Sequence, residues 1–341
     1  MRLFLLFFLF SFLFSCRKNE KEITRSFYYW QSSYQLSAHE KQTLTTLSVQ
    51  KLYIKFFDVH WEVSAGQPVP VASINFSETI PDGIEIIPVV YITNETLQKL
   101  NNDEVKTLAF KINKKIEDIL EENNLAVPAE IQLDCDWSET TKEKYFFLIE
   151  EMKKFPLWEK VRWSATIRLH QIKYVEKTGA PPVNRGMLMF YNMGNIKDAS
   201  AKNSIYETEI AKQYLAKVSD YPLPLDAAIA CYSWGLLFDD TELLKIFYPL
   251  YPADLPDTLF KKQSENIFTA KRNFYFEGSF LTQGNVVKLE TMNPSVSLES
   301  AKLLAKELKN NTFSVILYHL DSTIVKNYTN EGFENIYSAF E

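Results

Sequence analysis

Two stretches in the middle of the chain alternate apolar and polar residues. Every second residue is apolar in residues 130–139 (EIQLDCDWSE), and most of residues 161–171 (VRWSATIRLHQ) repeat the pattern. A period of two predicts β-strands with one apolar and one polar face. Because helical patterns lie between the strands, helices would cover the apolar faces and leave the polar faces inside a parallel barrel. We therefore expect one shared cavity for Asp134, Asp136, Arg168 and His170.

The rest of the chain supplies the other elements of such a barrel. Strand patterns occur at residues 26–33, 51–58, 84–93, 130–139, 161–171, 186–194, 223–234 and 313–320. Helical periodicity occurs at residues 37–48, 94–123, 140–154, 204–219, 298–308 and 330–340. Residues 59–83 lack it, and residues 235–294 exceed any normal loop. The prediction is an α/β (β/α)8 TIM barrel with an irregular second crossover, a large insertion after strand seven, and residues 173–184 as a loop over the site.

The amino terminus has the pattern of a secretory signal. Arg2 is followed by an apolar run that ends before Cys16, which is too short for a spanning helix. The last residues, LFSC, resemble the lipobox of bacterial lipoproteins, in which the cysteine is acylated. We predict a signal peptide at 1–15, a tether at 16–25 that begins with lipidated Cys16, and one domain at 26–341. The protein would then be anchored to a bacterial membrane, facing the periplasm or the cell surface.

Charge and cysteine content narrow the chemistry. The net charge of -6 becomes -7 once Arg2 leaves with the signal, which argues against a nucleic-acid partner. Cys135 and Cys231 fall in strands that are not neighbours, so two buried free thiols are favoured over a disulfide. The chain has only 4 histidines and no close ligand spacing, so we predict no structural metal site and no cofactor.

Two short motifs resemble those of a known enzyme family. Residues 133–137 (LDCDW) resemble the strand-four signature D-x-x-D-x-D-x-E of chitinase-type glycoside hydrolases (family 18), and residues 189–192 (MFYN) resemble their strand-six M-x-Y-[DN]. The YYW, DVHW and LHQ segments are also similar to a group of bacterial barrel lipoproteins related to those hydrolases. The resemblance implies that the substrate's acetamido group acts as the nucleophile. It also implies catalytic roles for Asp136 in orienting that group, Asp134 as its charge-sharing partner, and Tyr191 as a donor.

The general acid of that family has no counterpart here. Its position is Ser138, and a hydroxyl cannot protonate a glycosidic oxygen near neutral pH. Glu139 is one residue further and points the other way by strand alternation. From the residues alone, Asp134 and Asp136 would repel each other, so one could hold a proton and act as the acid. The alternative is an ion-pair network filling the interior, in which an inward Lys55 would pair with Asp134.

Further side chains at predicted strand ends are candidates for binding substrate. The set, which suits hydrogen bonding to sugar hydroxyls or stacking on sugar rings, is Arg168, His170, Gln171, Asn192, Trp234 and Asp58. Tyr232 and Trp234 could instead pack under the insertion, and His170 could be a satisfied interior histidine. A metal held by Asp58, His60 and Asp136 is an alternative that the sequence leaves open, and Glu290 is a further carboxylate in the insertion.

Three functions fit these observations. The first is a membrane-anchored, glycoside-hydrolase-like barrel acting on an extracytoplasmic glycan. The second is a glycan-binding lipoprotein that has lost the general acid, and the third is a structural envelope lipoprotein whose cavity is plugged. A carboxylate other than Asp134 in the cavity, at about 5 to 5.5 Å or about 6.5 to 9.5 Å from Asp136, would favour hydrolysis, and its absence would favour binding. The glycan, its linkage and the oligomeric state are open.

Overall fold

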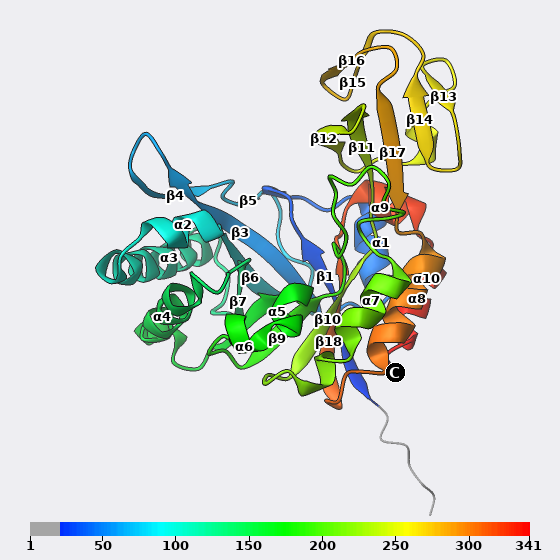
Figure 1. The fold of residues 1–341 in the computed structure, drawn as a ribbon. Coiled ribbons are helices and arrows are strands. Elements are labelled where there is room, and N and C mark those ends of the chain that lie inside the picture. The colour runs from blue at the N-terminus through cyan, green and yellow to red at the C-terminus, as the bar shows by residue number, and fades with distance from the viewer. Residues whose placement is uncertain (1–20) are drawn as a thin grey trace, which may run out of the picture.

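The computed structural model describes residues 21–341, and its centre is a closed barrel of eight parallel strands (Figure 1). The strands lie in the order β1, β18, β10, β9, β8, β7, β6, β3, and β1 also pairs with β3, which closes the sheet. Their bounds are β1 (Glu22–Tyr29), β3 (Lys51–Glu62), β6 (Glu85–Ile92), β7 (Glu130–Cys135), β8 (Arg162–Ile167), β9 (Arg185–Met189), β10 (Leu225–Ala230) and β18 (Thr312–Tyr318). The predicted TIM barrel is confirmed. The signal peptide and Cys16 lie outside the described residues.

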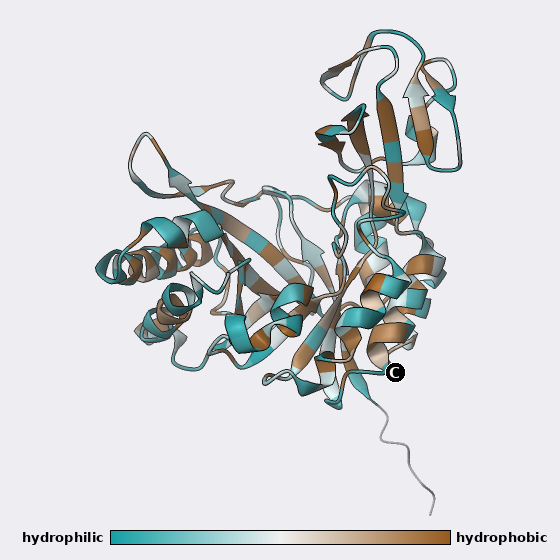
Figure 2. Ribbon diagram, viewed as in Figure 1, coloured by the Kyte–Doolittle hydropathy of each residue, from teal (hydrophilic) through white to brown (hydrophobic). Residues whose placement is uncertain are grey.

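Helices surround the barrel, and their banded hydropathy in Figure 2 is that of amphipathic helices. They are α1 (Ala38–Thr46), α2 (Asn94–Lys99), α3 (Asn102–Glu122), α4 (Lys142–Lys153), α5 (Leu169–Lys173), α6 (Val175–Thr178), α7 (Thr208–Leu215), α8 (Pro294–Ala305), α9 (Ser322–Asn327) and α10 (Asn330–Ser338). Short 3₁₀ turns occur at Pro156–Trp158, Val218–Asp220 and Pro252–Asp254. Within residues 21–341, no helix is both long and apolar enough to cross a membrane.

Local capping explains where several helices begin. Ser37 and Glu40 form the predicted capping box of α1. The expected single helix at 94–123 is two helices, because Asn101 forms a second capping box with Glu104 and starts α3 anew. The second crossover lacks a helix at residues 59–83, as expected, and begins with a hairpin: β3 runs on to Glu62 and pairs with β4 (Gln67–Val71). A short parallel pair, β2 (Ser33–Tyr34) with β5 (Asn75–Phe76), follows the hairpin's return.

The insertion after strand seven is an antiparallel sheet with its own core. Its strands β11 (Ser233–Asp239), β12 (Glu242–Phe247), β13 (Phe260–Lys262), β14 (Ile267–Ala270) and β17 (Val286–Thr291) lie in the order β12, β11, β17, β14, β13. A hairpin of β15 (Phe274–Phe276) and β16 (Ser279–Leu281) lies beside it. Leucine, valine and phenylalanine side chains fill this core, which includes Leu237, Phe247, Leu250, Phe260, Phe268 and Val287. In Figure 1 the insertion rises above the carboxyl end of the barrel, opposite the start of β1.

The lower half of the barrel interior is filled by bonded polar side chains. Gln132 accepts a hydrogen bond from the Tyr28 hydroxyl at 2.6 Å and donates to Ser164 at 3.3 Å. Ser164 in turn donates to Glu130 at 2.6 Å, and Tyr53 also donates to Glu130. Burial raises the pKa of Glu130. All five of these side chains are buried, so this half of the interior is occupied by polar groups that bond to one another.

Several strand bounds differ from the expectation, and three of the differences affect the site or the tether. The fourth strand stops at Cys135 instead of residue 139, and the fifth stops at Ile167 because the chain turns into α5. The first strand starts at Glu22, so residues 22–25 of the predicted tether belong to the barrel. Cys135 and Cys231 are buried free thiols, as predicted.

Candidate functional site

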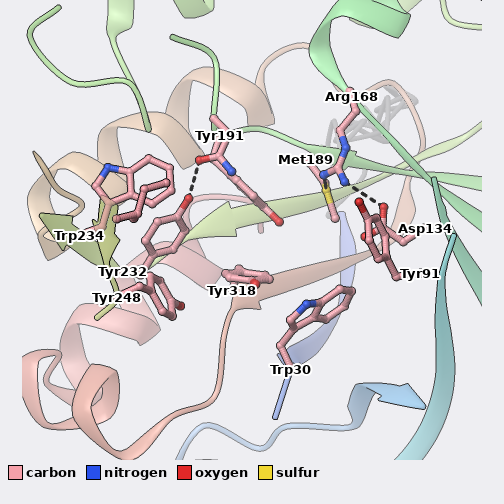
Figure 3. A pocket seen from close by; sticks show the side chains of 12 residues that line it. Trp30, Tyr91, Asp134, Arg168, Met189, Tyr191, Tyr232, Trp234, Tyr248 and Tyr318 are labelled. Atoms are coloured by element: carbon pink, nitrogen blue, oxygen red, sulfur yellow. Dashed lines mark hydrogen bonds and ion pairs between the residues drawn. The ribbon is translucent and has the colours of Figure 1, made fainter. Parts of the chain in front are cut away.

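A cavity of about 380 Å³ opens at the carboxyl end of the barrel strands (Figure 3). Its size lies in the range of small-ligand sites, about 300 to 1,000 Å³. The lining residues come from most of the barrel strands and from the insertion, and they are Trp30, Tyr91, Asp134, Arg168, Met189, Tyr191, Asn192, Tyr232, Trp234, Ile246, Tyr248 and Tyr318. The cavity therefore lies where the barrel fold predicts chemistry.

One ion pair forms the charged part of the cavity. Arg168 Nη2 lies 3.0 Å from Asp134 Oδ1, and the Thr166 hydroxyl donates to the same oxygen at 2.5 Å (Figure 3). The Asp134 side chain is 3% exposed and that of Arg168 is 25% exposed. Burial opposes the charge on Arg168, but Asp134 acts together with Tyr191, Asp136 and Tyr28 to outweigh it and to raise the guanidinium pKa. The pair is therefore a fixed dipole in the cavity floor.

The sequence after β8 holds this arginine in place. Arg168 precedes α5, and its backbone N–H donates to Gln171 Oε1 at 2.7 Å. Gln171 Nε2 donates to the Trp137 carbonyl at 3.0 Å, which ties α5 to the end of β7. Gln171, expected to bind substrate, is fully buried behind the cavity, so that prediction is wrong. Its role is to position the backbone of Arg168.

Aromatic rings make up the walls. The Tyr318 centroid lies 6.0 Å from Trp30 and 5.6 Å from both Tyr191 and Tyr232, and Tyr232 lies 5.4 Å from Trp234. The Tyr191 hydroxyl is buried and has no hydrogen-bond partner among the described residues. Because burial raises the pKa of Tyr191, this hydroxyl stays protonated and can donate a hydrogen bond. The cavity thus combines ring faces with an unused donor.

The insertion completes one wall. Trp234 belongs to β11, Ile246 to β12, and Tyr248 follows β12. The Tyr232 hydroxyl donates to Asn192 Oδ1 just before the insertion begins, as the dashed line in Figure 3 marks. Trp234 and Tyr232 both line the cavity, and Tyr232 also packs against Trp234 and Tyr248 of the insertion. The expected packing is therefore present, and sugar binding by these rings stays a prediction.

Asp136 and His170 do not share this cavity, contrary to expectation. They pair with each other at 3.3 Å on the outer rim, where their side chains are 56% and 46% exposed. The alternation of β7 ends at Cys135, so Asp136 no longer points into the barrel. His170 lies on α5 instead of a strand. The predicted catalytic role of Asp136 therefore loses its geometric basis, as does substrate binding by His170.

Asp58 and Lys55 form a second pair beside the cavity. Lys55 Nζ lies 3.0 Å from Asp58 Oδ2 and 5.7 Å from the centre of the Trp30 ring. The prediction that Lys55 pairs with Asp134 is wrong, because the bulge in β3 brings Asp58 onto the same face of the strand as Lys55. Asp58 does not line the cavity. Within residues 21–341, no three His, Cys, Asp or Glu side chains cluster in a way that could hold a metal, so the alternative site with His60 has no support.

The segment after β7 supplies no acid. The Ser138 backbone N–H and hydroxyl both interact with the Thr141 hydroxyl at the start of α4. Glu139 is exposed and does not line the cavity. Residues 173–184 include α6 and do not roof the cavity, contrary to expectation; the Thr178 carbonyl instead accepts the Trp137 indole N–H at 2.9 Å.

Five predicted site residues meet in the cavity, and these are Asp134, Arg168, Tyr191, Asn192 and Trp234. Sequence reasoning assigned no site role to Trp30, Tyr91, Met189, Ile246, Tyr248 and Tyr318. Three of these, Trp30, Tyr91 and Tyr318, lie at or near the carboxyl ends of β1, β6 and β18. A search for aromatic residues at strand ends would have found them. Ile246 and Tyr248 carry no such signal, because only the folded insertion brings them to the barrel.

Comparisons with known proteins identify the fold. No protein-family model matches the sequence, and no curated protein matches it. The chain is similar in structure to the C-terminal domain of a putative chitinase from Desulfitobacterium hafniense, with a TM-score of 0.60, 11% identity, and coverage of 94% of this chain and 100% of that one. It is also similar to the spore cortex-lytic enzyme SleL from Bacillus cereus, with a TM-score of 0.54, 13% identity, and coverage of 94% and 75%.

A third similar structure contains a ligand. It is a mutant class V chitinase from Nicotiana tobaccum in complex with NAG4, with a TM-score of 0.52, 10% identity, and coverage of 94% of this chain and 99% of that one. At these identities the likeness shows the fold alone. This chain therefore shares its barrel fold with chitinase-type structures, one of which is a GH18 chitinase from Flavobacterium johnsoniae.

Proposed function

We propose that the cavity binds a glycan without hydrolysing it. The observation that carries this proposal is the composition of the cavity wall. Aromatic rings form most of it, and Asp134, the one carboxylate among the twelve lining residues, is already paired with Arg168. The C–H faces of sugar rings pack well on aromatic faces, and sugar hydroxyls suit the remaining polar groups. A cavity of about 380 Å³ is also too open for a purely structural barrel filled with its own side chains.

The polar groups favour a sugar that carries an amide. Both hydrogen bonds to Asp134 fall on Oδ1, and no described residue donates to Oδ2, which leaves an acceptor for a ligand N–H. Tyr191 offers an unused donor for a ligand carbonyl. An acceptor in the cavity and a buried, unbonded hydroxyl on a lining residue match the two ends of an acetamido group. An N-acetylated oligosaccharide is therefore the proposed ligand.

Hydrolysis is less well supported. Glycosidases usually need two carboxyl groups about 5 to 9.5 Å apart on either side of the scissile bond, and the twelve lining residues include one. The family mechanism with an acetamido nucleophile still needs an acid that can release a proton. Asp134 is instead engaged inside the protein, where it pairs with Arg168 and accepts the Thr166 hydroxyl. Asp136 lies outside, and Ser138 has no suitable acidity.

A hydrolase is the second candidate because of the strand-four register. Glu130, Gln132 and Asp134 are the three inward residues of β7, and Asp134 is the last of them. If the motif is read in this register, Asp134 takes the place of the family's Glu, instead of Ser138. Its shorter side chain and its ion pair argue against equal activity. Measured hydrolysis that is lost in Asp134→Asn would favour this second function.

We also propose membrane anchoring through Cys16 in a bacterial cell envelope. The lipobox-like LFSC motif supports it. The first barrel strand begins at Glu22 on the face opposite the cavity, so a tethered barrel would present the cavity away from its anchor. Cys16→Ala is expected to remove fatty-acid labelling and to move the protein from the membrane fraction to the soluble fraction. Unchanged fractionation and labelling would contradict the anchor.

The test of binding compares two aspartates that are two residues apart. Purified protein is titrated with N-acetylated oligosaccharides by calorimetry and assayed for cleavage. Asp134→Asn is expected to weaken binding at least about tenfold, while Asp136→Asn, the matched control on the outer rim, changes affinity less than twofold. Tyr191→Phe provides a variant that leaves the ion pair intact. Absence of binding by the unmodified protein, or loss in Asp136→Asn alone, would overturn the assignment.

A further inference from the structure

The insertion turns a pair of buried charges toward the barrel. Lys288 and Glu290 are two residues apart on β17, and their charged atoms lie 2.8 Å from each other. Their side chains are 3% and 0% exposed, so neither charge reaches water. The alternate residues of β17, Val287 and Leu289, belong to the insertion's apolar core. The charged face of β17 is therefore the one that meets the rest of the protein.

Glu290 binds two segments that border the glycan cavity. Its Oε2 accepts the indole N–H of Trp234 at 2.8 Å and the backbone N–H of Ser204 at 3.0 Å. The hydroxyl of Ser204 donates to the same oxygen. One carboxylate thus connects β17, β11 and the loop that leads from β9 to α7.

The first of these contacts sets a cavity wall. Trp234 lines the cavity, and the hydrogen bond from its Nε1 to Glu290 restricts rotation of the indole ring about the side-chain bonds. An indole has a single polar atom, so this bond is the one polar restraint on the plane of the ring. A ring that stacks on a sugar must hold its plane, because tilting removes the contact area.

The second contact holds the loop that carries Tyr191 and Asn192. Gly194 donates its backbone N–H to the Ser204 carbonyl at 2.9 Å, which closes residues 194–204 into a loop. A Cβ at Gly194 would lie 2.7 Å from the Ser204 Cα, so the two backbones touch. Fixing Ser204 through Glu290 therefore fixes the end of the segment that places the unused Tyr191 donor.

We propose that Glu290 is a positioning residue for the glycan site, acting through Trp234 and Ser204 without touching the ligand. The inference rests on the proposed glycan binding and assigns a role to the insertion: its sheet holds part of the cavity wall in register with the barrel. A buried ion pair is in itself weak evidence of stability, because apolar residues of similar volume often serve as well. A carboxylate at position 290 is explained by the three donors that it aligns, which are the Trp234 indole N–H, the Ser204 backbone N–H and the Ser204 hydroxyl.

The test compares two buried carboxylates at opposite ends of the barrel in the full chain. Glu290→Gln keeps the shape of the side chain but removes its charge. Asp226→Asn is the matched control, because Asp226 is also buried and pairs with Arg185 at 2.7 Å, near the amino ends of the strands. Each variant is measured for affinity toward an N-acetylated oligosaccharide, for its urea midpoint, and for the indole N–H resonance of Trp234, assigned with Trp234→Phe.

Glu290→Gln is expected to weaken binding about tenfold and to move the Trp234 indole resonance. Asp226→Asn is expected to lower the urea midpoint comparably while changing affinity less than twofold and leaving the resonance in place. Ser204→Ala removes one donor without unpairing a charge, so it gives a smaller loss of affinity in a folded protein.

Two results separate failure of this inference from failure of glycan binding. If the unmodified protein binds the oligosaccharide and neither Glu290→Gln nor Ser204→Ala changes its affinity, the positioning role is wrong. If the unmodified protein binds no glycan, the proposed function fails. The Trp234 resonance then still tests the contact, because an unmoved signal in Glu290→Gln overturns it without any ligand.

Discussion

The barrel interior has two halves that are both polar but differ in what their polar groups do. In the lower half, Tyr28, Gln132, Ser164 and Glu130 are buried and bond to one another. In the upper half, a cavity of about 380 Å³ is walled by aromatic rings, and the Tyr191 hydroxyl has no partner among the described residues. Polar side chains inside a barrel therefore do not mark a site by themselves. Space, ring faces and unused donors do.

Breaking the ion pair in the upper half should have the largest effect on stability. Arg168→Met leaves Asp134 buried without its cation, which we expect to lower the free energy of unfolding by about 3 kcal/mol, since the guanidinium is partly solvated. Chemical denaturation measures this. The double variant Asp134→Leu/Arg168→Met should recover most of the stability and still fail to bind glycan. Poor recovery would mean that the pair is needed for folding.

Substituting one tyrosine in each half of the barrel interior should separate effects on protein stability from effects on glycan binding. Tyr28→Phe leaves Gln132 without its donor and should lower the free energy of unfolding by about 1 to 2 kcal/mol without changing affinity. Tyr191→Phe removes a hydroxyl that has no protein partner, so stability should change by less than about 0.5 kcal/mol while glycan affinity falls about fivefold. Denaturation and calorimetry on the same two proteins decide this. The reverse pattern would exchange the roles of the two halves.

The pH dependence of stability should depend on Glu130, the buried carboxyl group in the lower half of the barrel. Burial raises the pKa of Glu130 above its ordinary value of 4.5, so the folded protein holds this proton more tightly than the unfolded chain. The resulting stabilisation is complete below the ordinary value and is lost as the pH rises through the raised pKa. Glu130→Gln should flatten that decline, because the substituted side chain does not titrate. Unfolding free energies measured from pH 4 upward, compared with exposed Glu139→Gln as the control, test this; equal slopes would contradict it.

A substitution in the Asp136–His170 pair on the outer rim should have the smallest effect on stability and on glycan affinity. Asp136 and His170 are both about half exposed, and surface pairs of this kind contribute about 0 to 1 kcal/mol. Asp136→Asn should therefore change stability by less than about 0.5 kcal/mol and should leave glycan affinity unchanged. A large loss of binding in this variant would return Asp136 to the site and would place the ligand across the rim.

The candidate site was predictable where a residue lies within a regular strand or directly at its end. The alternation in residues 130–135 correctly pointed Asp134 inward, and the carboxyl ends of β8 and β9 correctly placed Arg168 and Tyr191. Extending the same alternation to Asp136 failed, because nothing in the local pattern reveals that the strand stops at Cys135. The Lys55 partner was missed for a similar reason, since the bulge in β3 depends on the neighbouring strand.

The sequence by itself determined the order of strands and helices, the irregular crossover and the presence of an insertion, because hydrophobic periodicity is a local property of the chain. Only the tertiary structure decided which polar residues are satisfied and which face open space. That difference depends on where strands end, on bulges, and on contacts such as Glu290 with Trp234, which join residues far apart in the chain. These distances are set by packing, and no local pattern encodes them.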